Sequence, residues 1–192
     1  MSLEAALLRG FAPDDTLARV EAIAAAAPFR HRITPGGFRM SVAMTNCGAL
    51  GWVSDRSGYR YSPVDPETGL PWPPMPESFL RLASEAAASA NFPAFVPEAC
   101  LINRYAPGAK MSLHQDRDER DLSQPIVSVS LGLPAVFLFG GPSRKDPVQR
   151  IALEHGDVVV WGGPARLFYH GVMPLKEGAR PYRFNLTFRR AG

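Results

Sequence analysis

The tripeptide His114-Gln115-Asp116 is the clearest sign of chemistry in this chain. In an extended segment, residues i and i+2 project to the same face, so the imidazole and the carboxylate converge on one point. A second imidazole is available in His170, which is expected to end a short strand. Two histidines and one carboxylate with open positions form the facial triad of non-haem Fe(II) oxygenases. The sequence therefore predicts an iron site at His114, Asp116 and His170. The alternative is that the tripeptide is a common one and that His170 packs in a core.

The segment Arg183–Arg189 alternates strictly between polar and apolar residues. If the segment is a strand, its polar members share one face: Arg183, Asn185, Thr187 and Arg189. The two arginines then lie about 20 Å apart at ~3.3 Å per residue. Both can lean inward and grip a short dicarboxylate from its two ends. The alternative is a half-buried strand with a solvated arginine face.

Asn103 and Tyr105 form a third element, just before the turn Pro107-Gly108. They share a face of the same expected strand and could offer an amide and a phenol to the same small acid. Without the other two elements, ordinary strand residues before a turn would explain them equally well.

The residues from Cys100 onward form short β-like runs separated by glycine and proline. We expect strands at 100–105, 126–131, 135–139, 150–153, 157–161, 166–169 and 183–188. Many short strands with regular turn residues favour a sandwich or jelly roll over an α/β fold. The last ~90 residues then form the β core, and the first ~100 decorate it.

The first half of the chain is expected to be scaffold and hairpins. Apolar residues at helical spacing predict helices over 13–27 and 77–90. Glycines interleaved with aromatic residues over 33–62 predict short strands and hairpins. There, Phe38 and Met40 are expected to pack in the hairpin core. Residues 63–76 are rich in proline and are expected to form an ordered connection.

The composition is that of one ordinary globular domain. The chain has 192 residues, 46% of them hydrophobic, and a net charge of +3. No apolar run approaches the ~20 residues that span a bilayer, and the N-terminus lacks a secretory signal. The two cysteines are expected to be reduced and buried, and a cytoplasmic location follows as the default. The protein is expected to be a monomer. Arginine outnumbers lysine among the basic residues, which suits phosphate and carboxylate recognition, although a GC-rich codon bias explains it as well.

Together these elements resemble the AlkB family of DNA-repair dioxygenases, which use Fe(II) and 2-oxoglutarate. The resemblance runs from about Phe11 to Gly192. The segments that carry it are Met40–Trp52, Leu101–His114, Pro125–Pro134, Leu153–Gly163, Leu167–Gly171 and Asn185–Arg189. The stretch between Gly171 and Arg183 departs from the family by being a few residues shorter.

The resemblance implies a mainly β protein with flanking helices, whose core is a double-stranded β-helix, a form of jelly roll. It implies a single dioxygenase domain over 1–192, with an N-terminal extension at about 1–32, a nucleotide-recognition lid at about 33–62 and a catalytic core at about 100–192. Iron would be bound by the triad. The residues implied to bind 2-oxoglutarate are Asn103, Tyr105, Arg183, Asn185 and Arg189. Arg183 with Tyr105 would hold the distal carboxylate.

The implied activity is oxidative demethylation of N-alkylated bases such as 1-methyladenine and 3-methylcytosine. O2 and 2-oxoglutarate are consumed, and formaldehyde, succinate and CO2 are released. The implied partner is single-stranded or duplex DNA with a flipped alkylated base, and RNA is also accepted.

The resemblance also implies how the base and its strand are held. Trp52 would stack on the flipped base, with Met44, Thr34, Tyr59 and Tyr61 lining the same lid. Asp118 would approach the exocyclic amine of the base. The residues implied to contact phosphates or sugars are Lys110, Ser112, Gln115, Arg117 and Arg144. For Arg117, a solvated basic rim is an equal alternative.

Two other functions fit the same core. One is an oxygenase that hydroxylates a small metabolite or a protein, which would have no use for Trp52 and a basic rim. The other is a jelly-roll binding module without catalysis, against which the complete triad and both arginines argue.

Overall fold

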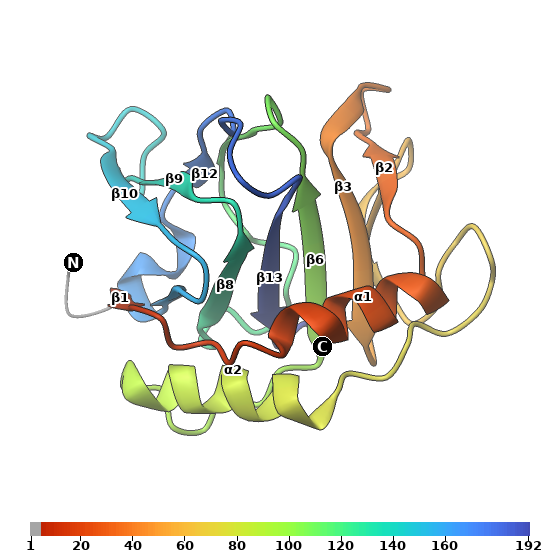
Figure 1. Ribbon diagram of the computed structural model, residues 1–192, viewed down its shortest axis with the longest axis horizontal. Helices are drawn as coiled ribbons and strands as arrows, with labels where there is room; N and C mark the ends of the chain where they lie inside the picture. Colours follow the sequence, from red (N-terminus) through yellow and green to blue (C-terminus); the bar gives the residue numbers. More distant parts are fainter. Residues whose placement is uncertain (1–4) are drawn as a thin grey trace.

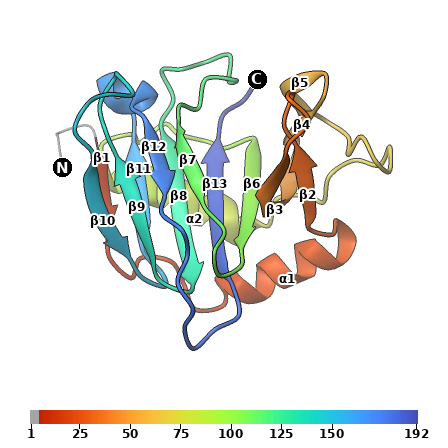
Figure 2. The same ribbon diagram turned by 90° about the horizontal axis from the view of Figure 1, so that it is seen from above.

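The computed structural model describes residues 5–192, which form three layers (Figure 1, Figure 2). The helices α1 (Thr16–Ala26) and α2 (Glu77–Ser89) lie on one side of a seven-stranded sheet. Its strand order is β1 (Ala5–Leu8), β11 (Val158–Trp161), β8 (Ile126–Gly132), β13 (Arg183–Arg189), β6 (Ala99–Tyr105), β3 (Arg39–Gly48) and β2 (Arg30–Ile33). The four-stranded sheet has the order β10 (Gln149–Leu153), β9 (Ala135–Phe139), β12 (His170–Val172) and β7 (Met111–His114). A separate hairpin is formed by β4 (Gly51–Asp55) and β5 (Gly58–Ser62).

One hydrophobic core lies between the helices and the larger sheet. Val20 and Ile23 of α1 and Phe79 and Leu82 of α2 belong to the same buried cluster as Leu186 of β13. The helices therefore cover one face of the sheet, as expected for scaffold. Asp15 stands at the N-cap of α1, but its side chain makes no capping hydrogen bond.

A second core fills the space between the two sheets. Phe137 and Phe139 of the smaller sheet pack in one cluster with Ile126 and Trp161 of the larger. Alternation along β13 then follows directly from the fold. Its apolar side chains face the helices, and its polar ones face the space between the sheets. This arrangement confirms the predicted mainly β jelly roll with flanking helices.

The prediction of a strand over 166–169 is wrong. Residues Gly163–Leu167 form a 3-10 helix with Pro164 in its first turn, and the next strand begins only at His170. Proline cannot donate to a strand ladder, and its fixed φ suits the first turn of a helix. His170 therefore begins a strand instead of ending one.

The β core is not confined to the last ~90 residues, as the sequence had suggested. β1, β2 and β3 are strands of the larger sheet, and β3 pairs with β6 over six residue pairs. The expected packing of Phe38 in a hairpin core is also wrong, because its side chain is 76% exposed. Met40, by contrast, is partly buried and packs against the second core.

The two cysteines confirm the expectation made for them. Cys47 of β3 and Cys100 of β6 are free and buried, and they face each other as register partners. Among the described residues, no helix is long and apolar enough to cross a membrane.

Candidate metal and co-substrate site

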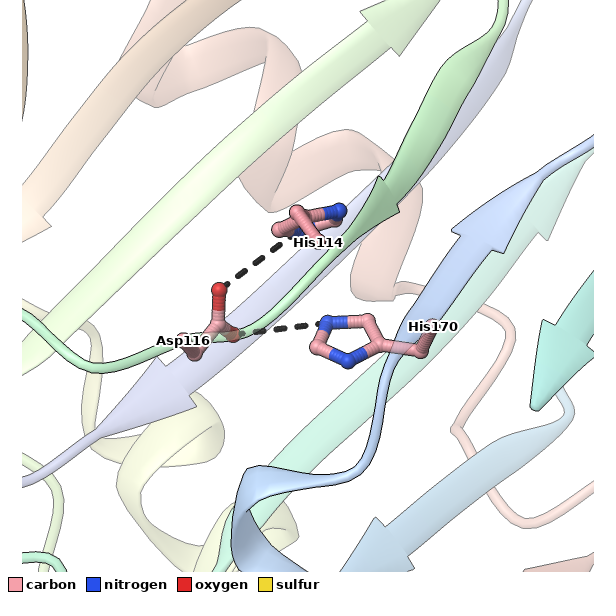
Figure 3. A group of neighbouring side chains, drawn as sticks. All are labelled: His114, Asp116 and His170. Atoms are coloured by element: carbon pink, nitrogen blue, oxygen red, sulfur yellow. Dashed lines mark ion pairs between the residues drawn. The ribbon is translucent and has the colours of Figure 1, made fainter. Parts of the chain in front are cut away.

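The three residues of the predicted triad meet because β7 and β12 are neighbours (Figure 3). His114 and His170 are register partners in this antiparallel pair, and their ring centroids are 4.4 Å apart. Asp116 follows β7 by two residues, and its carboxylate faces both imidazoles from one side. Its carboxylate oxygens are 3.5 Å from His114 Nε2 and 3.7 Å from His170 Nε2. Gly171 permits the close approach, because a Cβ there would lie 2.7 Å from the Met111 carbonyl oxygen.

The hydrogen bonds of both imidazoles orient them for a metal. His114 Nδ1 lies 2.9 Å from the Ser112 carbonyl oxygen, and His170 Nδ1 lies 3.0 Å from the Phe168 carbonyl oxygen. A carbonyl can only accept, so Nδ1 carries the proton in each ring and the Nε2 lone pair faces Asp116. One ligand atom from each of the three residues lies within 4.8 Å of the others. Two neutral imidazoles and a carboxylate with open positions fit Fe(II).

The electrostatics favour the metal-binding forms of His170 and Asp116. Burial, helped by the charge of His114, lowers the pKa of His170 to about 4. His170 is therefore neutral at pH 7. Burial alone would raise the pKa of Asp116, but Arg189 and the two histidines hold it well below its usual range. For His114, burial acts downward, yet the hydrogen bond and charge of Asp116 leave its pKa raised.

The polar side chains of β13, together with Asn103 of β6, form a polar row that lines the space between the sheets. Arg183 lies at the end of this row that is far from the triad. It is 1% exposed, its guanidinium lies over the Tyr105 ring at 5.0 Å, and its Nη2 donates to Ser130 Oγ at 2.9 Å. Its Nε and Nη1 have no hydrogen-bond partner. Burial lowers the pKa of Arg183 and raises that of Tyr105. A buried guanidinium with two free donors is costly unless a ligand completes it.

The amides of the row lie between the two arginines. Asn185 Nδ2 donates to Ser128 Oγ at 2.8 Å, and Asn103 Oδ1 is buried without a partner. These residues, with Tyr105, line a cavity of about 750 Å³ that also contains the triad. Unpartnered polar atoms aimed into one cavity fit a small dicarboxylic acid, which supports the prediction for 2-oxoglutarate.

Arg189 stands at the metal end of the row. Its guanidinium donates to Asp116 Oδ2 at 2.5 Å and lies 3.2 Å from Glu119 Oε1. Burial disfavours its charge, but the negative neighbours, Asp116 first, raise its pKa overall. Its Nη1 has no partner. The polar row therefore presents one guanidinium beside the triad and another at the far end.

Glu119 was missed by sequence reasoning, as was its partner Arg166. The Glu119 carboxylate accepts from Arg166 Nη2 at 3.0 Å and from the Tyr61 hydroxyl at 2.5 Å, and it pairs with Arg189. Arg166 also donates to the Asp116 carbonyl oxygen at 2.7 Å. This buried group ties the metal loop to β5 and β13. Tyr61 does not line the cavity as implied; its hydroxyl is turned to Glu119, and burial raises its pKa well above the usual range.

Replacing Glu119 by glutamine is expected to lower the free energy of unfolding by about 3–5 kcal/mol. The change removes the buried negative charge that Arg166 and Arg189 share. Urea unfolding monitored by circular dichroism measures it, with Glu21→Gln on the exposed face of α1 as the matched control. Equal stability of the two variants would contradict the bridging role of Glu119.

Trp52 is held by its surroundings as a wall of the cavity. Its backbone nitrogen donates to Asn46 Oδ1 at 3.0 Å, which fixes the backbone of Trp52 next to β3. Its Nε1 donates to Asp118 Oδ2 at 2.9 Å, and its ring stacks on Tyr59 with centroids 5.4 Å apart. Met44, buried in β3, lines the same cavity. A flat ring, an acceptor and an apolar floor thus share one space with the triad.

The remaining predicted contact residues all line this cavity. They are Thr34, Tyr59, Lys110, Ser112, Gln115, Arg117, Asp118 and Arg144. The further lining residues that were not predicted as site residues include three aromatic ones: Phe137, Trp161 and Tyr169. Phe137 and Trp161 sit in expected strands, but no local pattern shows which strand face lines a cavity. Tyr169 was assigned to a strand that does not form.

Comparisons with known proteins agree with this geometry. The model of the 2OG-Fe(II) oxygenase superfamily matches residues 4–189. The alpha-ketoglutarate-dependent dioxygenase AlkB of Escherichia coli is 60% identical over 98% of this chain and 90% of that protein. The DNA N(6)-methyladenine demethylase ALKBH1C of Arabidopsis thaliana is 31% identical over 74% of this chain and 38% of that protein. The solved structure of OsALKBH1 superposes with a TM-score of 0.82 at 30% identity, over 97% of this chain and 98% of that one.

The superfamily match identifies Fe(II) and 2-oxoglutarate as the groups that the triad and the polar row would bind. The identity to AlkB extends over nearly the whole of both chains. The chain therefore belongs to the 2OG-Fe(II) oxygenase superfamily and, within it, to the AlkB family of dioxygenases, with Fe(II), 2-oxoglutarate and O2 as its cofactor and co-substrates.

Proposed function

We propose that the protein is an oxidative demethylase that repairs N-alkylated bases, such as 1-methyladenine and 3-methylcytosine, in DNA and also in RNA. The observation that carries the proposal is the pairing of Trp52 with Asp118 in the cavity that holds the triad. The names of the relatives support it, since one is a DNA demethylase and AlkB is 60% identical.

The substrate is a base flipped out of its strand. A base inside a duplex cannot bring its methyl group to a metal at the bottom of a cavity, so it must leave the stack. Trp52 supplies a flat surface for stacking. The Asp118 carboxylate, which accepts from Trp52 Nε1, can accept from an exocyclic amine beside it. Lys110, Arg117 and Arg144 at the rim supply positive charge for the backbone phosphates.

The residues of the chain divide the work of the reaction. Fe(II), with 2-oxoglutarate and O2, supplies the oxidation of an unactivated C–H bond, which no side chain can perform alone. The triad holds the metal, and Arg183 with Tyr105 holds the distal carboxylate of 2-oxoglutarate. Trp52 and Asp118 fix the base so that its methyl group points to the metal. The hydroxylated methyl group leaves as formaldehyde, and the base is restored.

A monomer in the cytoplasm is the proposed working form. One chain supplies every group named above, so the site needs no partner subunit. The free, buried pair Cys47 and Cys100 suits a reducing compartment.

Trp52→Ala is expected to raise the KM for a methylated oligonucleotide about tenfold, because stacking of a base on an aromatic ring contributes about 1–3 kcal/mol. The KM for 2-oxoglutarate in the absence of oligonucleotide should stay unchanged, since the hydrogen bonds of Trp52 join it to Asn46 and Asp118 and not to the polar row. Steady-state assays of formaldehyde and succinate measure the two constants. Trp72, a buried tryptophan outside this cavity, provides the control variant Trp72→Phe. An unchanged KM for oligonucleotide in Trp52→Ala would show that the base does not stack on Trp52.

The test of the function is a comparison of substrates. The purified protein with iron, 2-oxoglutarate and O2 should release formaldehyde from methylated oligonucleotides and leave free amino acids unmodified. The reverse result would favour the small-molecule or protein hydroxylase.

A further inference from the structure

Arg144 lies at the mouth of the cavity, and one edge of its guanidinium has no partner among the described residues. Its guanidinium lies over the Tyr169 ring, 5.2 Å from the centroid. Among residues 5–192, no carboxylate lies within ion-pair distance of it, and its side chain makes no hydrogen bond. Stacking uses the face of a guanidinium and leaves the in-plane N–H groups free to bind an anion.

The backbone of Tyr169 is bonded to the loop that carries Arg144. Tyr169 N donates to the Gly141 carbonyl oxygen at 2.9 Å, and Gly140 N donates to the Tyr169 carbonyl oxygen at 2.8 Å. A Cβ on Gly140 would lie 3.2 Å from that same oxygen, so the two segments are in close contact. The ring and the loop are therefore fixed to each other.

The loop itself places Arg144 in a closed turn. Asp146 Oδ2 accepts from Ser143 N at 2.8 Å, and Asp146 N donates to the Ser143 carbonyl oxygen at 3.1 Å. Arg144 lies between these two residues, so its backbone is held from both sides. Its long side chain would otherwise lose rotamer freedom on binding, and the Tyr169 ring reduces that loss.

Tyr169 also connects this cation to the metal site. It directly precedes the ligand His170, whose strand pairs with β9 immediately before the loop. A shift of the Tyr169 backbone relative to the triad would have to break this ladder. The Arg144 guanidinium is therefore held at a fixed position relative to the metal ligands.

We infer that Tyr169 is a positioning residue for nucleic-acid binding, whose ring holds the Arg144 guanidinium at the cavity mouth so that its free edge contacts a substrate phosphate. The inference rests on the function proposed above and deepens it, because it assigns one phosphate of the strand to a defined distance from the metal. Tyr169 itself contacts no reacting atom.

Direct binding tests the inference without any turnover. Fluorescence anisotropy of a labelled, unmethylated single-stranded oligonucleotide gives Kd as a function of salt. Arg144→Ala should raise Kd and reduce the slope of log Kd against log salt by about 0.7, the contribution of one phosphate of a single strand. Arg190→Ala, an exposed arginine outside the cavity, is the matched charge control and should keep the slope.

Variants of Tyr169 separate positioning from charge. Tyr169→Leu keeps all charges and should raise Kd about two- to fivefold, the range of an exposed cation–π contact. Tyr169→Phe keeps the aromatic face and should stay within about twofold of the unaltered protein. Combining Tyr169→Leu with Arg144→Ala should add nothing to Arg144→Ala alone. Should Tyr169→Leu fail to fold, Asp146→Glu keeps the charge but displaces the carboxylate from Ser143 N, which loosens the turn without touching β12 and should raise Kd to a similar extent.

Three results would overturn the inference: a Kd unchanged in Tyr169→Leu and in Asp146→Glu, equal losses in the Phe and Leu variants, or additive losses in the double variant. The proposed function fails separately, by absence of demethylation in the unaltered protein. That failure is visible in the formaldehyde assay whatever the binding constants are.

Discussion

Replacing His170 by alanine is expected to reduce turnover to less than about a thousandth of its original rate, because the metal step supplies several kcal/mol of barrier reduction. His170 Nε2 is one of three ligand atoms within 4.8 Å of one another. Two ligands cannot hold Fe(II) in the facial arrangement that leaves positions for 2-oxoglutarate and O2. Anaerobic titration with Fe(II) should therefore show weak binding or none.

Loss of activity must be separated from loss of fold in this variant. His170 is 5% exposed and packs against Trp161 with ring centroids 5.0 Å apart, so alanine leaves a small cavity. His170→Gln fills that space and should be equally inactive. His31→Ala removes an exposed imidazole outside the cavity and should keep both iron binding and turnover. A His170→Ala protein that binds iron normally and turns over would place the metal elsewhere.

Arg183→Met is expected to raise the KM for 2-oxoglutarate on the order of a hundredfold or more, since truncating one partner of a buried charge pair costs about 2–5 kcal/mol. Arg183 offers two unpartnered donors in the cavity, and methionine offers none. Arg183→Lys keeps the charge but lacks the planar fork, so its KM for 2-oxoglutarate should lie between those of the unaltered protein and Arg183→Met. Succinate formation at varied 2-oxoglutarate concentration gives the values.

The same Arg183→Met change should not destabilise the protein without 2-oxoglutarate. Arg183 makes one side-chain hydrogen bond, to Ser130, and its other donors are buried without partners. Replacing an unpaired buried charge by an apolar side chain of similar volume is neutral or stabilising. The melting temperature without ligand should therefore stay equal or rise, while the increase on adding 2-oxoglutarate should vanish. A large fall in melting temperature together with an unchanged KM would show that Arg183 is structural.

The chemistry closest to the metal was predictable because it depends on short-range spacing. His114 and Asp116 are two positions apart, and the alternation of Arg183–Arg189 sorts its own side chains between two faces. Such patterns predict the fold correctly because side chains in a strand must alternate between its two faces. The pairing of His114 with His170 was inferred from residue type, and the structure supplies the adjacent strands that it needs.

The supporting residues were not predictable because their partners are far away in sequence. Glu119 accepts from Tyr61 and from Arg166, which are 58 and 47 positions away. No local pattern marks a carboxylate as the centre of such a group. Phe38 shows the converse, since an aromatic residue between glycine and β3 gives no sign of whether anything will cover it. The 3-10 helix before His170 shows that glycine and proline next to an apolar run can override its strand propensity.

Mass spectrometry of an oligonucleotide carrying one 1-methyladenine, incubated with the protein, Fe(II), 2-oxoglutarate and O2, tests the central claim most directly. The account predicts loss of one CH2 in mass from the oligonucleotide, with one succinate and one formaldehyde formed for each base restored. His170→Gln in parallel should leave the mass unchanged. Consumption of 2-oxoglutarate with the methylated oligonucleotide recovered intact, for this base and for 3-methylcytosine, would contradict it.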